Sequence, residues 1–191
     1  MSKFSKIIIS IVTVCTLFII TYINDKRMKE NINLRGLATV DGSKGLEIHN
    51  KYRKIHHVGP LKLNKDLSTI AQKYAEHLAA KNKFEHSHGK YKGKSMGENL
   101  YYSWSSNVAK CDDSSIVEAT KSWYNEVLKY DFNKAKFTKD TGHFTQVVWK
   151  NTKQVGFGVA SSKDKKKCYV VANYFPAGNV IGSFKQNVLK K

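Results

Sequence analysis

Apolar residues recur at helical spacing in three parts of the chain. From Leu67 to residue 79 they follow the i, i+3, i+4, i+7 pattern of an amphipathic helix. A shorter stripe of apolar residues begins at Leu46 and ends before Gly59 and Pro60, two residues that terminate helices. A third stripe begins after Ser115, which has capping-box spacing to Glu118. The pattern predicts helices over 46–57, from 67 to 79 and from 115 to 130.

Alternating apolar and polar residues predict extended segments at 97–104, 155–160 and 169–175. The polar residues 161–167 join the last two as a hairpin. Residues 82–97 are rich in His, Gly and Lys and are interpreted as a loop, and 142–149 as a short helix. Three helices around a small antiparallel sheet predict an α+β layered domain.

The N-terminal segment is a targeting segment. Residues 7–23 are apolar apart from small hydroxyl residues, and they follow Lys3 and Lys6. This length exceeds the usual core of a signal peptide and just reaches the lower limit for crossing a bilayer. Residues 1–23 are therefore either a cleaved signal peptide or a retained signal anchor, and 24–45 are interpreted as a linker. In both cases the domain after them is expected to face the secretory lumen or the outside.

The chain is strongly basic. Its 33 Lys and Arg residues against 15 Asp and Glu give a formal charge of +18. Such a charge favours acidic partners, among them anionic lipids, sulfated glycans and nucleic acid. The basic residues are scattered, with one short run at 165–167, and no nucleic-acid motif accompanies them. We therefore expect no nucleic-acid partner.

Three cysteines are present, and Cys15 lies in the targeting segment. Cys111 and Cys168 remain for the domain, and in an oxidising compartment two cysteines predict one disulfide. Two unpaired thiols are the alternative, because sequence spacing does not give the distance between cysteines in the fold.

Two imidazoles and two carboxylates form a candidate ligand set: His86, Glu98, Glu126 and His143. Glu126 lies on the inward-facing edge of the third predicted helix, although a boundary Glu that turns to solvent is an equal alternative. Imidazole suits zinc, while a carboxylate orients the imidazole or binds directly. The spacings match no local metal motif, so the residues alone give a weak signal. His56, His57 and His88 are interpreted as surface residues.

Six motifs in order resemble the CAP superfamily, which contains cysteine-rich secretory proteins, antigen-5 venom proteins and plant pathogenesis-related proteins. They are HNKYR at 49–53, HS at 86–87, GENL at 97–100, WYNE at 123–126, GHFTQVVWKNT at 142–152 and NYFPAGN at 173–179. The resemblance covers residues 46–189 and implies a three-layer α-β-α sandwich.

The resemblance also assigns roles to residues. It implies a cleft lined by His86, Glu98, Glu126 and His143 that is able to bind zinc, with the two His residues as the ligands. His49 and Arg53 fall in a structural signature rather than a catalytic one.

The FPAGN motif, together with Ala172 where many members carry Cys, most resembles the Golgi-associated plant pathogenesis-related members of the superfamily. Those members are intracellular and are held to membranes by an acylated N-terminal glycine. This chain begins Met1-Ser2, which does not allow that anchor. We therefore expect an extracellular protein, or a single-pass membrane-anchored one with a lumenal or extracellular domain.

The resemblance implies a non-enzymatic protein that binds lipid, sterol or an anionic membrane. Such a protein could serve in defence or act on a host. The alternative is a metal-dependent hydrolase or protease that uses the same cleft. No nucleophile elbow is present, and two His ligands are fewer than the three ligands usual for catalytic zinc. Some relatives self-associate, so a homodimer is a further expectation.

Overall fold

The computed structural model describes residues 19–26 and 40–191. The chain divides into two compact units, 1–38 and 39–191. In the first unit residues 19–26 are helical, and the rest of the predicted targeting segment lies outside the described residues, as do positions 27–39 of the predicted linker. Within the described part of the chain, no helix is long and apolar enough to cross a membrane.

The helices of the second unit are α2 (Ser43–Ile55), α3 (Lys65–Lys81), α4 (Asp113–Asn125), α5 (Gly142–Val147), α6 (Phe184–Asn187) and the 3-10 turns η1 (Glu126–Lys129) and η2 (Lys139–Thr141). The strands are β1 (Lys62–Leu63), β2 (Lys90–Tyr91), β3 (Lys94–Ser95), β4 (Gly97–Trp104), β5 (Gln154–Ser161) and β6 (Lys167–Phe175). Each predicted helix and extended segment has a counterpart, and α2 begins within the segment interpreted as a linker.

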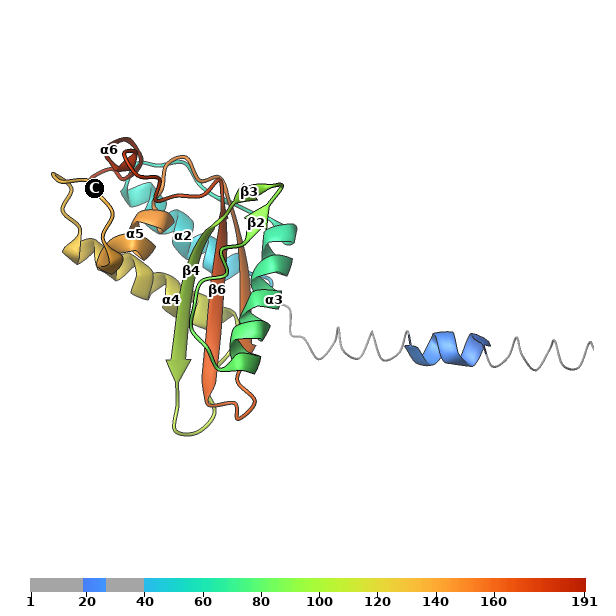
Figure 1. The fold of residues 1–191 in the computed structure, drawn as a ribbon. Helices are drawn as coiled ribbons and strands as arrows, with labels where there is room; N and C mark the ends of the chain where they lie inside the picture. The colour runs from blue at the N-terminus through green and yellow to red at the C-terminus, as the bar shows by residue number, and fades with distance from the viewer. Residues whose placement is uncertain (1–18, 27–39) are drawn as a thin grey trace, which may run out of the picture. The chain divides into compact units, whose positions relative to one another are not determined.

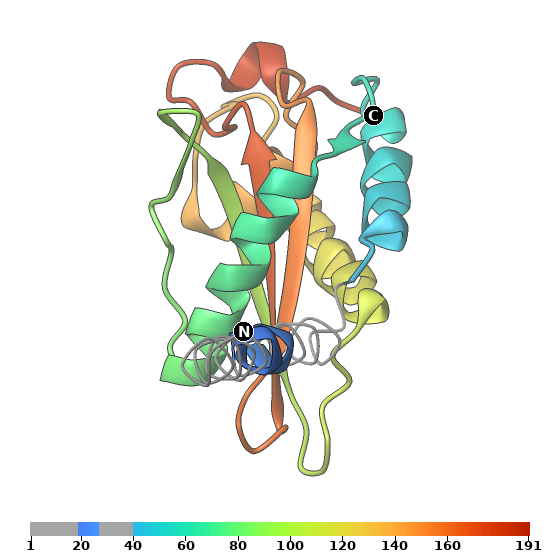
Figure 2. The same ribbon diagram turned by 90° about the vertical axis from the view of Figure 1, so that its right-hand side faces the viewer.

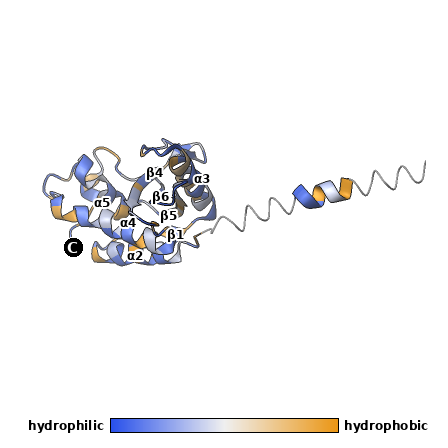
Figure 3. Ribbon diagram, turned by 90° about the horizontal axis from the view of Figure 1, so that it is seen from below, coloured by the Kyte–Doolittle hydropathy of each residue, from blue (hydrophilic) through white to orange (hydrophobic). Residues whose placement is uncertain are grey.

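The main sheet has the strand order β1-β5-β6-β4. β6 pairs antiparallel with both β4 and β5, and only the two-residue β1 pairs parallel with β5. α3 packs on one face of this sheet, while α2, α4 and α5 lie on the other (Figures 1 and 3). The architecture is thus the α-β-α sandwich that the family resemblance implied.

Two glycines of β5 allow α3 to approach the sheet closely. A Cβ atom on Gly156 would collide with the backbone of Leu67 and Ser68, and one on Gly158 with the backbone of Gln72. Because backbone cannot move aside as a flexible side chain can, a larger residue at either position would push α3 off the sheet. The close packing of α3 on β5 therefore requires glycine at these two positions.

The beginning of α4 differs from the prediction. Asp112 is the N-cap: its side chain accepts a hydrogen bond from the Ser114 amide at 2.8 Å, and the Ser115 hydroxyl accepts one from the Asp112 amide at 3.3 Å. Ser115 thus closes the capping box as its third helical residue, and the predicted box between Ser115 and Glu118 is wrong. The α-helix also ends at Asn125, where the chain tightens into η1.

Cys111 and Cys168 form a disulfide, with their Cα atoms 5.3 Å apart. The bond joins the loop before α4 to the first residues of β6. The predicted pairing is confirmed.

The segment 82–97, interpreted as a loop, contains a small hairpin. β2 and β3 pair antiparallel there, with Lys90 opposite Ser95. Tyr91 is buried, and its hydroxyl donates a hydrogen bond to Asp66 near the start of α3. The hairpin is too short to give a strand signal in the sequence.

Candidate functional site

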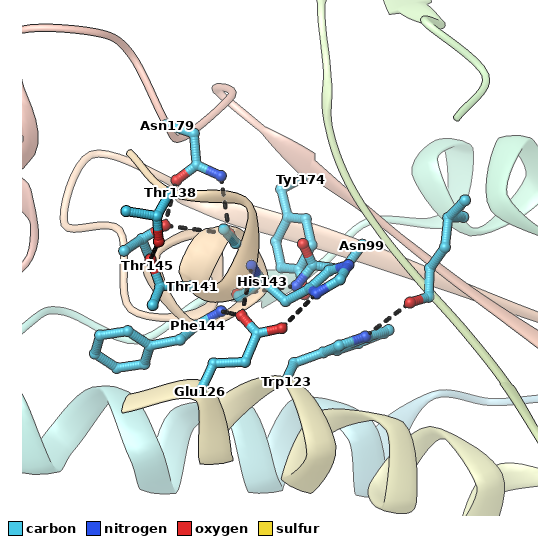
Figure 4. Close-up of polar contacts among 12 residues, drawn as sticks. Asn99, Trp123, Glu126, Thr138, Thr141, His143, Phe144, Thr145, Tyr174 and Asn179 are labelled. Carbon is cyan, nitrogen blue, oxygen red and sulfur yellow. Dashed lines mark hydrogen bonds and ion pairs between the residues drawn. The ribbon is translucent and has the colours of Figure 1, made fainter. Parts of the chain in front are cut away.

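Glu126 connects the end of α4 to the start of α5. One carboxylate oxygen accepts a hydrogen bond from Nδ1 of His143 at 2.7 Å. The other accepts from the backbone amides of His143 and Phe144, each at 3.0 Å (Figure 4). The carboxylate therefore uses the free amides at the beginning of α5, where negative charge is favoured, and fixes the imidazole at the same time.

Glu98 on β4 holds His86 in a similar manner. Nδ1 of His86 donates to Oε1 at 2.8 Å, and the amide of Ser87 donates to the same oxygen at 2.9 Å. The Ser87 hydroxyl donates to Oε2 at 2.5 Å. The Glu98 side chain is 8% exposed while His86 is 50% exposed, so a nearly buried carboxylate orients an accessible ring.

β4 contacts both His–Glu pairs through Glu98 and Asn99. Glu98 and Asn99 are consecutive, and the Asn99 amide donates to the carbonyl of His143 at 3.1 Å and to the Tyr174 hydroxyl at 3.3 Å. Asn99 thus ties the start of α5 to β4, the edge strand on which Glu98 lies. Figure 4 shows Asn99 beside His143 and Tyr174. Neither periodicity nor motif spacing indicated this role for Asn99.

The structure assembles the four predicted residues as two pairs. Among the described residues, no group of three or more His, Cys, Asp or Glu side chains is placed to hold a metal ion. In each pair Nδ1 of the imidazole faces a carboxylate, which leaves Nε2 as the nitrogen without a partner within its pair. A ligating His typically donates its other ring N–H to a carboxylate, so each ring is held as a metal ligand would be.

A small open pocket of about 150 Å³ lies beside His86. It is lined by His86, Ser87, His88, Gly89, Met96 and Glu98. His88 is exposed at its rim, as predicted, and has a positive φ of 51°. The pocket gives a solvent-borne ligand access to the first His–Glu pair.

Arg53 is fully buried and pairs with no carboxylate in the described part of the chain. Its guanidinium donates to the carbonyls of Gly59, Val147, Trp149 and Thr152, at 2.8 to 3.1 Å. Burial lowers its pKa to about 10, so it stays charged at neutral pH. Arg53 thereby fastens the segment after α5 to α2, a structural role that agrees with the prediction.

His49 is buried beside Arg53 and is also structural. Its Nδ1 donates to the Gly45 carbonyl at 2.8 Å, and its Nε2 accepts from the Tyr174 hydroxyl at 2.8 Å. Burial lowers the pKa of His49 to about 4, against the opposing effect of the Gly45 carbonyl. Burial likewise raises the pKa of Tyr174 well above its usual value, so both groups are neutral near pH 7.

His56 is fully buried, and its interpretation as a surface residue is wrong. Its ring bonds to the Leu189 carbonyl at 2.6 Å and to the Tyr124 hydroxyl at 3.1 Å. The C-terminal segment covers this end of α2, and burial lowers the pKa of His56. His57, next to it, is exposed as expected.

Gln146 joins the two C-terminal motifs that were recognised in the sequence. Its buried side chain accepts a hydrogen bond from the Gly178 amide at 2.8 Å and donates to the Thr152 hydroxyl at 3.2 Å. Thr145 donates to Asn179 at 2.6 Å in the same region. These polar residues therefore position α5 and His143 against the chain after β6.

The chain is similar in sequence to known proteins. The sequence profile of the cysteine-rich secretory protein family matches residues 46–174. Human Golgi-associated plant pathogenesis-related protein 1 is 47% identical over 146 residues, covering 75% of this chain and 89% of that protein. Venom allergen 5 of Microctonus hyperodae is 37% identical over 131 residues, covering 65% of this chain but only 55% of that protein.

Solved structures show the same fold. The structure titled "NaASP2 with Zn2+" aligns with a TM-score of 0.61 and 25% identity, covering 82% of this chain and 88% of that one. BmVAL-1 aligns with a TM-score of 0.58 and 24% identity over 77% of this chain and 81% of that one. On the profile match and the identity to the human protein, this chain belongs to the cysteine-rich secretory protein (CAP) family.

Proposed function

We propose that the chain is a secreted or membrane-tethered binding protein, not an enzyme. The observation that carries this is the state of the two carboxylates at the site. Both oxygens of Glu98 and both oxygens of Glu126 already accept hydrogen bonds from their own His residues, from backbone amides or from Ser87. A general base needs a carboxylate oxygen within reach of the proton that it removes. Here one oxygen of each carboxylate holds an imidazole, and the other accepts from the Ser87 hydroxyl or from backbone amides.

The site is suited to hold a divalent ion through His86 and His143. The donor set fits zinc, since each ring has Nδ1 on a carboxylate and presents Nε2. Two imidazoles are one ligand fewer than catalytic zinc sites usually have, so the ion would be held weakly and would keep solvent ligands. The structural relative titled with Zn2+ supports the choice of metal.

The ligand class that we propose is lipid at an anionic membrane. The net charge of +18 favours a negatively charged surface, and the disulfide between Cys111 and Cys168 suits an oxidising compartment outside the cytosol. Relatives named as venom allergens agree with a secreted protein.

Zinc titration calorimetry tests the proposed ion site. We expect the purified chain to take up zinc, and the double variant His86→Ala, His143→Ala to lose that uptake. His88→Ala is the matched control, because His88 lines the same pocket but contacts neither carboxylate among the described hydrogen bonds. Equal zinc uptake by the double variant would reject these ligands. Zinc-dependent hydrolysis by the wild type that is lost in Glu98→Gln or Glu126→Gln would reject the binding role.

A further inference from the structure

The end of the sheet far from α6 is formed by two loops that are fastened to each other. The amide of Ser105 donates to the Lys166 carbonyl at 2.9 Å, and the amide of Ala109 donates to the Lys165 carbonyl at 2.8 Å. The Cys111–Cys168 disulfide joins the residues that follow the two loops in the sequence. Figures 1 and 2 show both loops projecting together from the same end of the molecule.

Large apolar side chains are exposed beside these loops. Trp104, the last residue of β4, is 62% exposed, and Val108 is 70% exposed. Tyr102 lies two residues before Trp104, on the same face of the strand, and Phe84 packs against it with ring centroids 5.1 Å apart. Exposed aromatic groups of this kind are usual in proteins that sit at a membrane interface, where Trp and Tyr are favoured.

Lysines of the β5–β6 loop lie on one side of the apolar residues. The β5–β6 loop, residues 161–167, contains four lysines and one aspartate. Lys167 lies directly opposite Trp104 across the β4–β6 pair. Asp164 is engaged within the loop, accepting bonds from the Ser162 hydroxyl and the Lys166 amide. The excess of positive charge therefore lies next to the exposed aromatic groups.

We propose that this end of the sheet, which we call the Trp104 face and define as Phe84, Tyr102, Trp104, Val108 and the lysines of 161–167, docks on an anionic lipid bilayer. The lysines contact lipid head groups, and Trp104 and Val108 enter the interface between head groups and acyl chains. A soluble polyanion would use the lysines but not the exposed Trp and Val. The inference rests on the proposed membrane-binding function and names the surface that carries it out.

Tryptophan fluorescence tests this surface in the full-length chain. The chain has three Trp residues and none in the N-terminal segment, and Trp123 and Trp149 are buried. Quenching by brominated acyl chains therefore reports on Trp104. We expect quenching with vesicles of phosphatidylcholine and phosphatidylserine at low salt, and its loss with phosphatidylcholine alone.

Variants locate the contact. Changing Lys163, Lys165 and Lys166 together to Gln is expected to raise the lipid concentration for half-maximal quenching roughly 100-fold. The matched control changes three exposed lysines of α2 and β1, Lys51, Lys54 and Lys62, to Gln, and is expected to change that concentration less than threefold.

The results separate two claims: that the protein binds anionic membranes, and that the Trp104 face makes the contact. If the protein binds the anionic vesicles in a salt-sensitive manner but Trp104 is not quenched, or if both lysine triplets act alike, the Trp104 face is overturned while the membrane-binding role stands. If the protein does not bind anionic vesicles, or binds only a sulfated glycan such as heparin, both claims fail.

Discussion

Acidification should destabilise the fold through His49. The pKa of this buried imidazole falls from its usual 6.5 to about 4, chiefly through burial. A lowered pKa means that the unfolded chain binds the proton more readily, so stability is complete above pH 6.5 and is lost as the pH falls toward 4. From these two pKa values, His49 alone removes about 2 kcal/mol of unfolding free energy between pH 7 and pH 5.

Urea denaturation at pH 7, 6 and 5 measures this loss in the wild type and in His49→Gln. Gln supplies one donor and one acceptor for the Gly45 carbonyl and the Tyr174 hydroxyl, but it does not titrate. The variant should therefore lose about 2 kcal/mol less than the wild type between pH 7 and pH 5. A smaller slope should persist in the variant, because burial also lowers the pKa of His56. Parallel stability curves for the two proteins would refute the reasoning.

Two further predictions concern stability. Gly158→Ala places a Cβ against the backbone of Gln72 and should lower the unfolding free energy by about 3 kcal/mol, whereas Gly59→Ala, which meets no atom within 4 Å, should change it by less than 1 kcal/mol in thermal or urea unfolding. Equal effects would show that α3 does not rest on β5 as described. Replacing Cys111 and Cys168 together by Ser should cost about 4 kcal/mol, because the bond closes a separation of 57 residues, and reductant should cost the wild type the same amount but leave the variant unchanged.

The helices were predictable because local periodicity specifies them. Buried Leu67, Ala71, Ala75 and Leu78 repeat along α3 as the sequence pattern required. The angle of Glu126 on the third predicted helix left the inward direction and the solvent direction as equal alternatives. Its partner at the start of α5 did not follow from that angle and came only from the resemblance.

Apart from the capping box of α4, the failures depend on contacts that are distant in sequence. His56 is buried because the C-terminal segment returns to α2, more than a hundred residues later, and no local signal shows this. Asn99 and Gln146 look like ordinary polar residues, yet they bond across 44 and 32 residues. In the sequence, Gly156 and Gly158 only weaken the strand pattern, although the close packing of α3 requires them.

The measurement that tests the central claim most directly is long-range 1H–15N NMR of His86 and His143, with and without zinc. If Glu98 and Glu126 orient these rings as ligands, each neutral imidazole carries its proton on Nδ1, and zinc should shift the Nε2 resonances of both. Rings protonated on Nε2, or Nε2 resonances that zinc leaves unchanged, would contradict the account.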